Sequence, residues 1–130
     1  MISKDEYERI ARHIVNAAYV VHKELGPGLL ESVYEVCLLE ELRNRGLYVE
    51  NQVKIPVVFK GKKLDKEFIV DLLVENAIVV ELKAVETILP VHEVQLLTYL
   101  KLADKKLGFL INFNVSIIKI GIHRKINGYL

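Results

Sequence analysis

The sequence predicts a single α/β domain that spans residues 1–130. Apolar residues recur at helical spacing in the first third of the chain and again near residues 90–103. Between these regions lie short continuous apolar runs, which are typical of strands buried on both faces of a sheet. With 130 residues, of which 52% are hydrophobic and 27% charged, the chain is long enough to bury one core and too apolar to be disordered.

Two helices are expected at the N-terminal end. Ser3 followed by Glu6 forms a capping-box pattern at the start of the first helix, and the Gly-Pro-Gly segment at residues 26–28 ends it. The second helix runs from about residue 29 to residue 45, and Gly46 ends it. The apolar positions at helical spacing include Ile10, Ile14, Ala17, Ala18, Val21 and Leu25 in the first helix, and Val33, Val36, Cys37 and Leu42 in the second.

The rest of the chain reads as strands interrupted by one helix. Residues 52–59 are predicted to form a strand, in which Pro56 indicates an edge position or a bulge. Residues 60–63 form a turn into the next strand. The helix is expected at residues 90–103, since a proline fits the first turn of a helix. Two apolar runs, one before Glu75 and Asn76 and one after them, are predicted strands. Residues 108–113 and residues 116–123 are predicted to form the last two strands, which gives the order α-α-β-β-β-α-β-β.

Composition narrows the classes of function. The net charge is only +1, so no basic field covers the whole protein, although a local basic rim would suffice to bind nucleic acid. The single cysteine, Cys37, excludes a disulfide framework and a cysteine-based zinc site. A polar N-terminus and the absence of an apolar run of roughly 20 residues predict a cytoplasmic protein that does not enter a membrane. Candidates for the basic rim, which are equally well ordinary surface charges, are Lys60, Lys62, Lys63, Lys66, Lys101, Lys105, Lys106, Arg124 and Lys125.

Three charged residues interrupt the central apolar runs. A three-residue turn at residues 75–77 would place Val74 across from Ile78, and counting back along the two strands puts Asp71 directly opposite Glu81. Directly paired residues have Cβ atoms roughly 5 Å apart, so two carboxylates in this position repel each other. Lys83 follows Glu81 by two residues and shares its face of the strand. The pattern therefore predicts a charged patch in a buried part of the sheet.

A divalent metal ion would explain this patch. Asp71 and Glu81 would hold one or two Mg²⁺ ions, which prefer oxygen ligands, and Mn²⁺ is the alternative ion. The metal would polarise a phosphodiester and acidify a bound water, and Lys83 would orient that water or stabilise the charge of the transition state. The other interpretation is a structural ion pair of Lys83 with one of the acids, and the spacing alone does not choose between the two.

Two predicted helices add further candidates. Gln95 and Tyr99 are four residues apart, so they project from one helical face, where they would bind a water or a phosphate and brace the lysine. Ordinary polar groups at a helix rim would give the same pattern. Glu31, at the start of the second helix, is either a residue that compensates the helix dipole or a third carboxylate that reaches the metal. Glu35 lies one turn after Glu31 and can share its face.

Gly28, Glu31 and Tyr34 form a Gly-x-x-Glu-x-x-Tyr pattern around the start of the second predicted helix. In this pattern the chain resembles the GxxExxY proteins, which belong to the PD-(D/E)XK nuclease superfamily. The resemblance continues through the segments DLLV (71–74), VELKA (80–84), QLLTYL (95–100) and GFLINF (108–113). The resemblance implies a restriction-endonuclease-like three-layer α/β/α core with a mixed central sheet flanked by helices. The proline in the name of the superfamily is absent, because Ile69 and Val70 precede Asp71.

The resemblance also implies roles for individual residues. Asp71, Glu81 and Lys83 would correspond to the metal-binding and catalytic triad of the superfamily. Gln95 and Tyr99 would correspond to the Gln-x-x-x-Tyr motif of its RecB-like and Cas4-like branch, and Glu31 would be the helical acid that assists the metal.

The expected function is metal-dependent hydrolysis of phosphodiester bonds in DNA rather than in RNA. The chain itself is expected to have little sequence specificity. The alternative is a catalytically weak or inactive nucleic-acid-binding or assembly module that keeps the nuclease fold. A third interpretation is a structural protein whose hairpin charges pair among themselves. The apolar segment at residues 117–122 is a candidate edge strand, through which the chain would form a homodimer.

Overall fold

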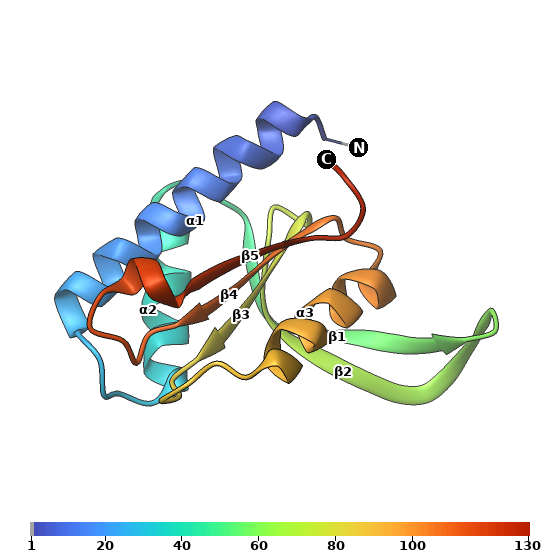
Figure 1. Cartoon of the computed structure of the whole chain (residues 1–130). Helices are drawn as coiled ribbons and strands as arrows, with labels where there is room; N and C mark the ends of the chain where they lie inside the picture. The colour runs from blue at the N-terminus through green and yellow to red at the C-terminus, as the bar shows by residue number, and fades with distance from the viewer. Residues whose placement is uncertain (1) are drawn as a thin grey trace.

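A mixed five-stranded sheet lies between two layers of helices in the computed structural model, which describes residues 2–130 (Figure 1). The strands are ordered β1-β2-β3-β4-β5, and only β3 and β4 are parallel. The elements are α1 (Lys4–Leu25), α2 (Glu31–Asn44), β1 (Val49–Phe59), β2 (Lys62–Val74), β3 (Ile78–Lys83), α3 (Pro90–Ala103), β4 (Leu107–Asn112), the 3₁₀-helix η1 (Ile118–Gly121) and β5 (Ile122–Ile126).

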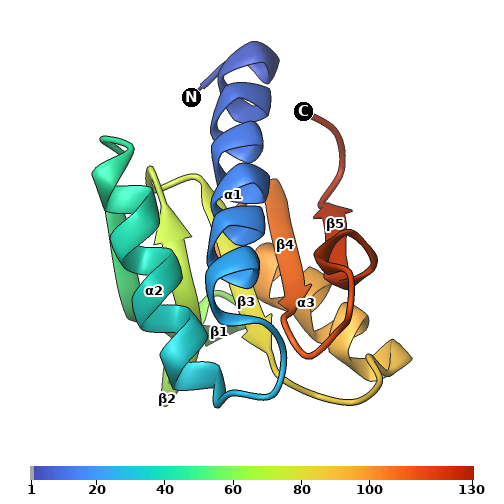
Figure 2. The ribbon, with the colours of Figure 1, turned by 90° about the vertical axis from the view of Figure 1, so that its left-hand side faces the viewer.

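The three layers follow from the connections between the elements. Helix α3 is the crossover that joins the parallel strands β3 and β4, and it packs on one face of the sheet. Helices α1 and α2 lie together on the other face, as the side view shows (Figure 2). The predicted three-layer α/β/α core with a mixed central sheet is therefore confirmed. No helix within residues 2–130 is long and apolar enough to cross a membrane.

Each face of the sheet has its own apolar core. The larger core, under α1 and α2, contains the fully buried residues Ile14, Leu38 and Leu72. The smaller core, under α3, includes Leu96 and Leu100 of that helix. Gly108 of β4 lets α3 approach closely, because a Cβ at this position would lie 3.0–3.3 Å from methyl groups of Leu96 and Leu100. The position of α3 on the sheet is thus set by a small residue beneath it.

The predicted helix ends and the central hairpin agree with the structure. The Ser3 hydroxyl accepts a hydrogen bond from the Glu6 amide and caps α1. Strand β3 is buried along nearly its whole length. Val74 pairs with Ile78 and Leu72 pairs with Val80, as the three-residue turn predicts.

The predicted strand at residues 116–123 is wrong. Residues 118–121 form the 3₁₀-helix η1, and the edge strand β5 begins only at Ile122. Ile118 is buried whereas Ile117 and Ile120 are exposed, which is not the alternation of a strand. Gly121 also requires this path, because a Cβ there would lie 2.1 Å from the carbonyl oxygen of Asn112. A run of isoleucines has high strand propensity, but the close approach of the two backbones decides the local structure.

Candidate functional site

Asp71 and Glu81 lie one residue beyond the last backbone pair of β2 and β3, and there their carboxylates accept the hydrogen bonds that join the two strands. The last paired residues are Leu72 and Val80. One residue further, the amide of Asp71 donates a hydrogen bond to Oε2 of Glu81 (3.2 Å), and the amide of Leu82 donates to Oδ2 of Asp71 (2.8 Å). Each carboxylate thus accepts a hydrogen bond from a backbone amide of the neighbouring strand. The predicted register is confirmed as far as Leu72 and Val80, and the hydrogen bonds bring the two acids together one residue beyond it.

The regular alternation of side chains along β2 is interrupted at Asp71. Leu72 belongs to the core under α1 and α2, whereas both Val70 and Leu73 belong to the core under α3. Strict alternation would place Val70 and Leu72 on the same face. The chain therefore changes its orientation between these residues, and the Asp71 carboxylate reaches the amide of the neighbouring strand instead of standing over one face.

The neighbouring strand β1 has an unusual backbone at the same level. The pairs Asn51–Leu72 and Val53–Val70 place Gln52 opposite Asp71. Gln52 has a φ of +52°, a left-handed conformation that is uncommon in a strand. Strain of this kind often occurs at functional sites.

The side chain of Gln52 joins the acid pair to helix α2. Its Nε2 donates to Oε1 of Glu35 (2.7 Å) and to Oδ1 of Asp71 (3.3 Å). One amide group therefore connects α2, β1 and β2. Sequence reasoning missed Gln52, because it named this residue only as the start of a strand.

The electrostatics of the pair are dominated by burial. Glu81 is 9% exposed. Burial raises its pKa to about 9, with the neighbouring Asp71 as the next cause, while Lys83 opposes the shift. Burial also raises the pKa of Glu35, which the negative charge of Asp71 raises further and the hydrogen bond from Gln52 lowers. Without a cation, the site therefore keeps a proton on Glu81 at neutral pH.

Lys83 is half-buried and forms no ion pair with a carboxylate of residues 2–130. Leu82 is buried in the core under α1 and α2, and the alternation of side chains along a strand would place Lys83 on the other face of β3. An ion pair of Lys83 locked between both acids, which the structural interpretation requires, is not found among these residues. The lysine lies near the acids without neutralising either by direct contact.

The segment that follows Lys83 is fixed by a buried asparagine. Asn112, 2% exposed, accepts hydrogen bonds from the amides of Val85 and Asn114, and its Nδ2 donates to the carbonyl of Val85. The amide of Phe113 donates to the carbonyl of Lys83. These bonds hold the connection from β3 to α3, and with it the start of the helix that carries Gln95 and Tyr99.

Tyr99 lies beside the acid pair. Its ring stacks on Phe68 of β2, with centroids 4.3 Å apart. Burial raises the pKa of the Tyr99 hydroxyl, and the negative charges of Glu81 and Asp71 raise it further. Gln95 is exposed one turn earlier on α3. His92 has a separate role, since its Nδ1 accepts a hydrogen bond from the amide of Leu89 at the start of the helix.

Glu31 is exposed at the first position of α2, and Glu35 lies one turn further along the helix. The structure connects Glu35, rather than Glu31, to Asp71 through Gln52. The start of α2 is held by Tyr34, which is fully buried and stacks on Phe113. The Tyr34 hydroxyl donates to the carbonyl of Gly26 (2.6 Å) and accepts from the amide of Leu29 (3.1 Å).

The acid pair is suited to a hard divalent cation. Among residues 2–130, no group of three or more histidine, cysteine or acidic side chains is arranged to hold a metal. Glu31 therefore does not form a ready three-ligand site with Asp71 and Glu81. Mg²⁺ in nucleotide chemistry is usually held by one or two carboxylates, with waters and substrate phosphates as its other ligands. Two adjacent carboxylates with no cationic partner in direct contact match that donor set.

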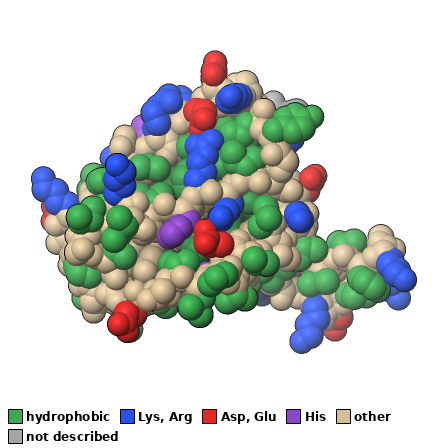
Figure 3. All heavy atoms as spheres, viewed as in Figure 1, with side chains coloured by type: hydrophobic (Ala, Val, Ile, Leu, Met, Phe, Trp, Pro, Cys, Tyr) green, Lys and Arg blue, Asp and Glu red, His purple; other side chains and the backbone are tan. Residues whose placement is uncertain are grey.

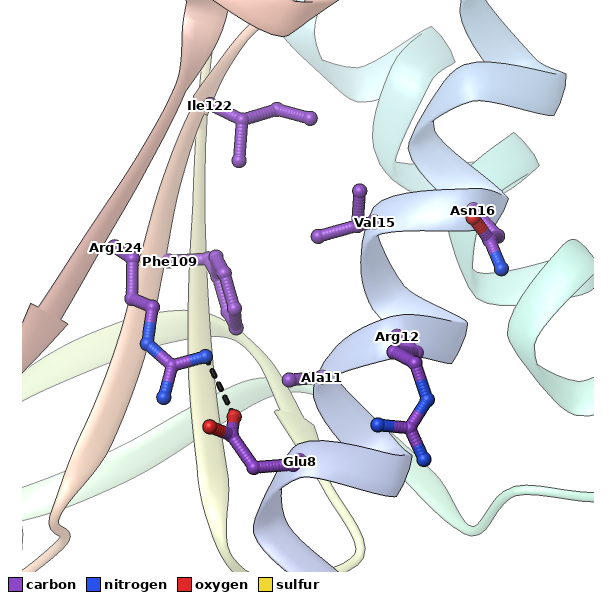
Figure 4. Close-up of a pocket in the computed structure, with 8 residues that line it drawn as sticks. All are labelled: Glu8, Ala11, Arg12, Val15, Asn16, Phe109, Ile122 and Arg124. Carbon is purple, nitrogen blue, oxygen red and sulfur yellow. Dashed lines mark hydrogen bonds and ion pairs between the residues drawn. The ribbon is translucent and has the colours of Figure 1, made fainter. Parts of the chain in front are cut away.

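A groove of about 570 Å³ lies elsewhere, between α1 and the strands β4 and β5 (Figure 4). Phe109 and Ile122 line it together with Val15, and Arg124 donates to Glu8 at its rim. Neither acid of the pair lines this groove. The candidate site is therefore defined by its charged groups and not by the depth of a cavity.

A sequence model of the PD-(D/E)XK nuclease superfamily matches residues 8–125 of the chain. The chain belongs to the PD-(D/E)XK nuclease superfamily. Nucleases of this superfamily act on nucleic acids and typically use divalent metals. This confirms the superfamily part of the resemblance, while the narrower match to the GxxExxY proteins stays a prediction.

One solved structure has a similar fold. The crystal structure of SSO0001 superposes on 98% of this chain with a TM-score of 0.52 and 24% sequence identity. The chain spans 60% of the length of SSO0001. No curated protein sequence matches the chain.

Proposed function

We propose that this PD-(D/E)XK superfamily member hydrolyses phosphodiester bonds in DNA with Mg²⁺ or Mn²⁺, and with little sequence specificity of its own. The observation that carries the proposal is the buried pair of Asp71 and Glu81, in which burial, and next the charge of Asp71, raise the pKa of Glu81 to about 9. A structural role does not require two acids in this position, because like charges placed opposite each other are destabilising.

Asp71 and Glu81 would hold the cation, and their bonds to backbone amides fix the direction of both carboxylates. A bound divalent cation would polarise the scissile phosphate and lower the pKa of a water molecule. Lys83 would place its positive charge next to the phosphate oxygens, where negative charge develops in the transition state. No carboxylate of residues 2–130 forms an ion pair with its ammonium group, which leaves that group free for a phosphate.

Helix α3 would supply positioning groups. Tyr99 stacks on Phe68, and both acids raise the pKa of its hydroxyl, which would contact Lys83 or the nucleic-acid backbone. Gln95 is exposed one turn away and would bind a water or a phosphate oxygen. Glu31, which is exposed at the start of α2, would act as the helical acid that assists the metal.

The test is a cleavage assay on labelled single- and double-stranded DNA and RNA, with Mg²⁺, with Mn²⁺ and with chelator. Lys83→Ala is purified in parallel. Lys119→Ala is the control, because Lys119 is an exposed lysine in η1. Cleavage of DNA that needs metal, is lost in Lys83→Ala and persists in Lys119→Ala is the expected result.

No cleavage of any substrate, together with no metal binding by calorimetry, would overturn the proposal. That outcome would favour the alternative, a nucleic-acid-binding or assembly module that keeps the nuclease fold.

A further inference from the structure

The hairpin of β1 and β2 extends beyond the rest of the molecule as an arm, defined here as residues 53–69 (Figure 1). Its base packs on α3 through Phe68, which stacks on Tyr99. Beyond the base, every residue from 58 to 67 is exposed, so neither face of the two strands is covered. An isolated two-stranded hairpin is only marginally stable in water. A bare arm of this length therefore indicates a surface that contacts a partner.

The arm concentrates the positive charge of the protein. Its five lysines and two acids give it a net charge of +3, whereas the whole chain carries only +1. The remainder of the chain is therefore net negative. Basic side chains, all of them lysines in this segment, gather at the tip of the arm, and apolar side chains lie along it (Figure 3). The lysines of the arm are Lys54, Lys60, Lys62, Lys63 and Lys66.

The turn at the tip places a lysine where another residue would fit better. Phe59 pairs with Lys62, so the connection has two residues, Lys60 and Gly61. Their φ values are +51° and +76°. A two-residue turn with both φ values positive favours asparagine or aspartate followed by glycine. Lys60 instead projects a positive charge at the outermost point of the arm, over the ring of the exposed Phe59.

The arm starts at the acid pair. Asp71 and Lys62 belong to the same strand, nine residues apart, which is about 30 Å at roughly 3.3 Å per residue. A stretch of about nine base pairs of duplex DNA has a similar length, at roughly 3.4 Å per base pair. A substrate whose scissile phosphate lies at Asp71 would therefore continue along the arm as far as its basic tip.

We propose that the arm binds duplex DNA next to the scissile phosphate, with the lysines of its tip on the phosphates. A two-stranded β-ribbon fits the major groove of B-form DNA, whereas the major groove of duplex RNA is too deep and narrow for side chains to read. The positive charge of the arm suits the phosphates of DNA. A second copy of this chain is a poorer partner, because the rest of that chain has only a small net negative charge. This inference rests on the proposed function, because it extends the substrate path from Asp71.

The test measures binding in chelator, so that affinity is read without cleavage. Fluorescence anisotropy with a duplex DNA of about 20 base pairs is recorded at several salt concentrations for the parent and for Lys60→Gln/Lys62→Gln/Lys63→Gln. Lys4→Gln/Lys23→Gln/Lys119→Gln is the matched control, because these three lysines are also exposed but lie outside the arm.

The expected result is at least tenfold weaker binding by the arm variant and a log K against log salt slope reduced by about 0.9 for each lost phosphate contact. The control variant should bind as the parent does. Where the parent cleaves DNA, the arm variant should raise KM and leave kcat unchanged, since a charge about 30 Å away is screened at a Debye length of about 8 Å.

Three outcomes would overturn the inference. Equal affinity of parent and arm variant would remove the arm from DNA binding, even if the protein cleaves DNA. An equal loss of affinity for duplex RNA would contradict the choice of duplex DNA. A dimer in sedimentation that Phe59→Ser abolishes, with DNA affinity unchanged, would assign the arm to a second copy of the chain. Failure of the proposed function is distinguishable, because it would remove cleavage and leave the binding comparison intact.

Discussion

The amide of Asp71 donates a hydrogen bond to the carboxylate of Glu81, although the side chain of Asp71 repels that same carboxylate. The backbone thus fixes Glu81 in a position where its ionisation is unfavourable. Burial is the main cause that raises the pKa of Glu81 to about 9, the charge of Asp71 is the next, and the hydrogen bond from the Asp71 amide opposes the shift. The two adjacent carboxylates therefore destabilise the protein unless a proton or a cation neutralises one of them.

The stability of the metal-free protein should fall as pH rises from about 4.5 to about 9. Between these values folded Glu81 is protonated and unfolded Glu81 is ionised, so the folded state binds more protons and the slope is negative. The contribution is at most about 1.4 kcal/mol per pH unit. Glu81→Gln should remove this slope and raise Tm at pH 8, whereas the exposed Glu86→Gln should leave it unchanged. Thermal unfolding in chelator at pH 5, 7 and 9 checks this, and an equal slope in Glu81→Gln would contradict it.

Metal binding should release a proton and strengthen with pH. Because the cation must displace the proton of Glu81, its affinity rises as pH increases toward 9. Asp71→Asn and Glu81→Gln should each abolish binding without unfolding the protein, because they remove the repulsion between the acids. Calorimetry with Mg²⁺ and Mn²⁺ in buffers of different ionisation enthalpy measures both quantities. A large drop of Tm in either variant would instead give the acids a structural role through their bonds to the backbone amides.

The sequence predicts the acid pair well and its surroundings poorly, for identifiable reasons. The three-residue turn between β2 and β3 fixes their register from Val74–Ile78 to Leu72–Val80, so counting one residue further brings Asp71 to Glu81, to which its amide donates. Counting from the Lys60–Gly61 turn would place Glu50 opposite Asp71. The register shift between Pro56 and Val58 moves Gln52 there instead. Pro56 indicates a bulge in the sequence, but its size is set by the backbone and not by a residue type.

The helices and the last strand show the same division. Capping by Ser3 and the proline at the start of α3 are local signals, and both helix starts are predicted correctly. The error at residues 116–123 arises from a contact distant in sequence, since Gly121 packs against the carbonyl of Asn112. The bridge from Glu35 to Asp71 is likewise a tertiary contact, and helical spacing alone does not distinguish Glu35 from Glu31.

Gln52 should contribute to the metal site more than to stability. Gln52→Ala removes the amide that connects Glu35 and Asp71, and the side chain is exposed, so we expect a loss of about 1 kcal/mol of stability or less. The freed Asp71 carboxylate should bind Mg²⁺ several-fold more weakly, because its direction is no longer fixed. Lys54→Ala, at an exposed position of the same strand, is the control. Unchanged metal affinity in Gln52→Ala would limit Gln52 to a structural role.

In the Gly28-x-x-Glu31-x-x-Tyr34 pattern, Tyr34 should contribute to stability and Glu31 to metal binding. Tyr34→Phe keeps the stacking on Phe113 but leaves the Gly26 carbonyl and the Leu29 amide without their partner, so the expected loss is about 2 kcal/mol. Glu31→Gln should keep the stability of the parent, since Glu31 is exposed at the start of α2.

The same pair of variants should show the opposite order in metal binding. Glu31→Gln should weaken Mg²⁺ binding, whereas Tyr34→Phe should preserve it once the protein is folded. Tyr7→Phe controls for loss of a hydroxyl from another buried tyrosine. Unfolding in urea and calorimetry give the two quantities separately. If Glu31→Gln binds Mg²⁺ as the parent does, the acid at this position acts on the helix dipole alone, and Glu35 becomes the helical acid nearest the site.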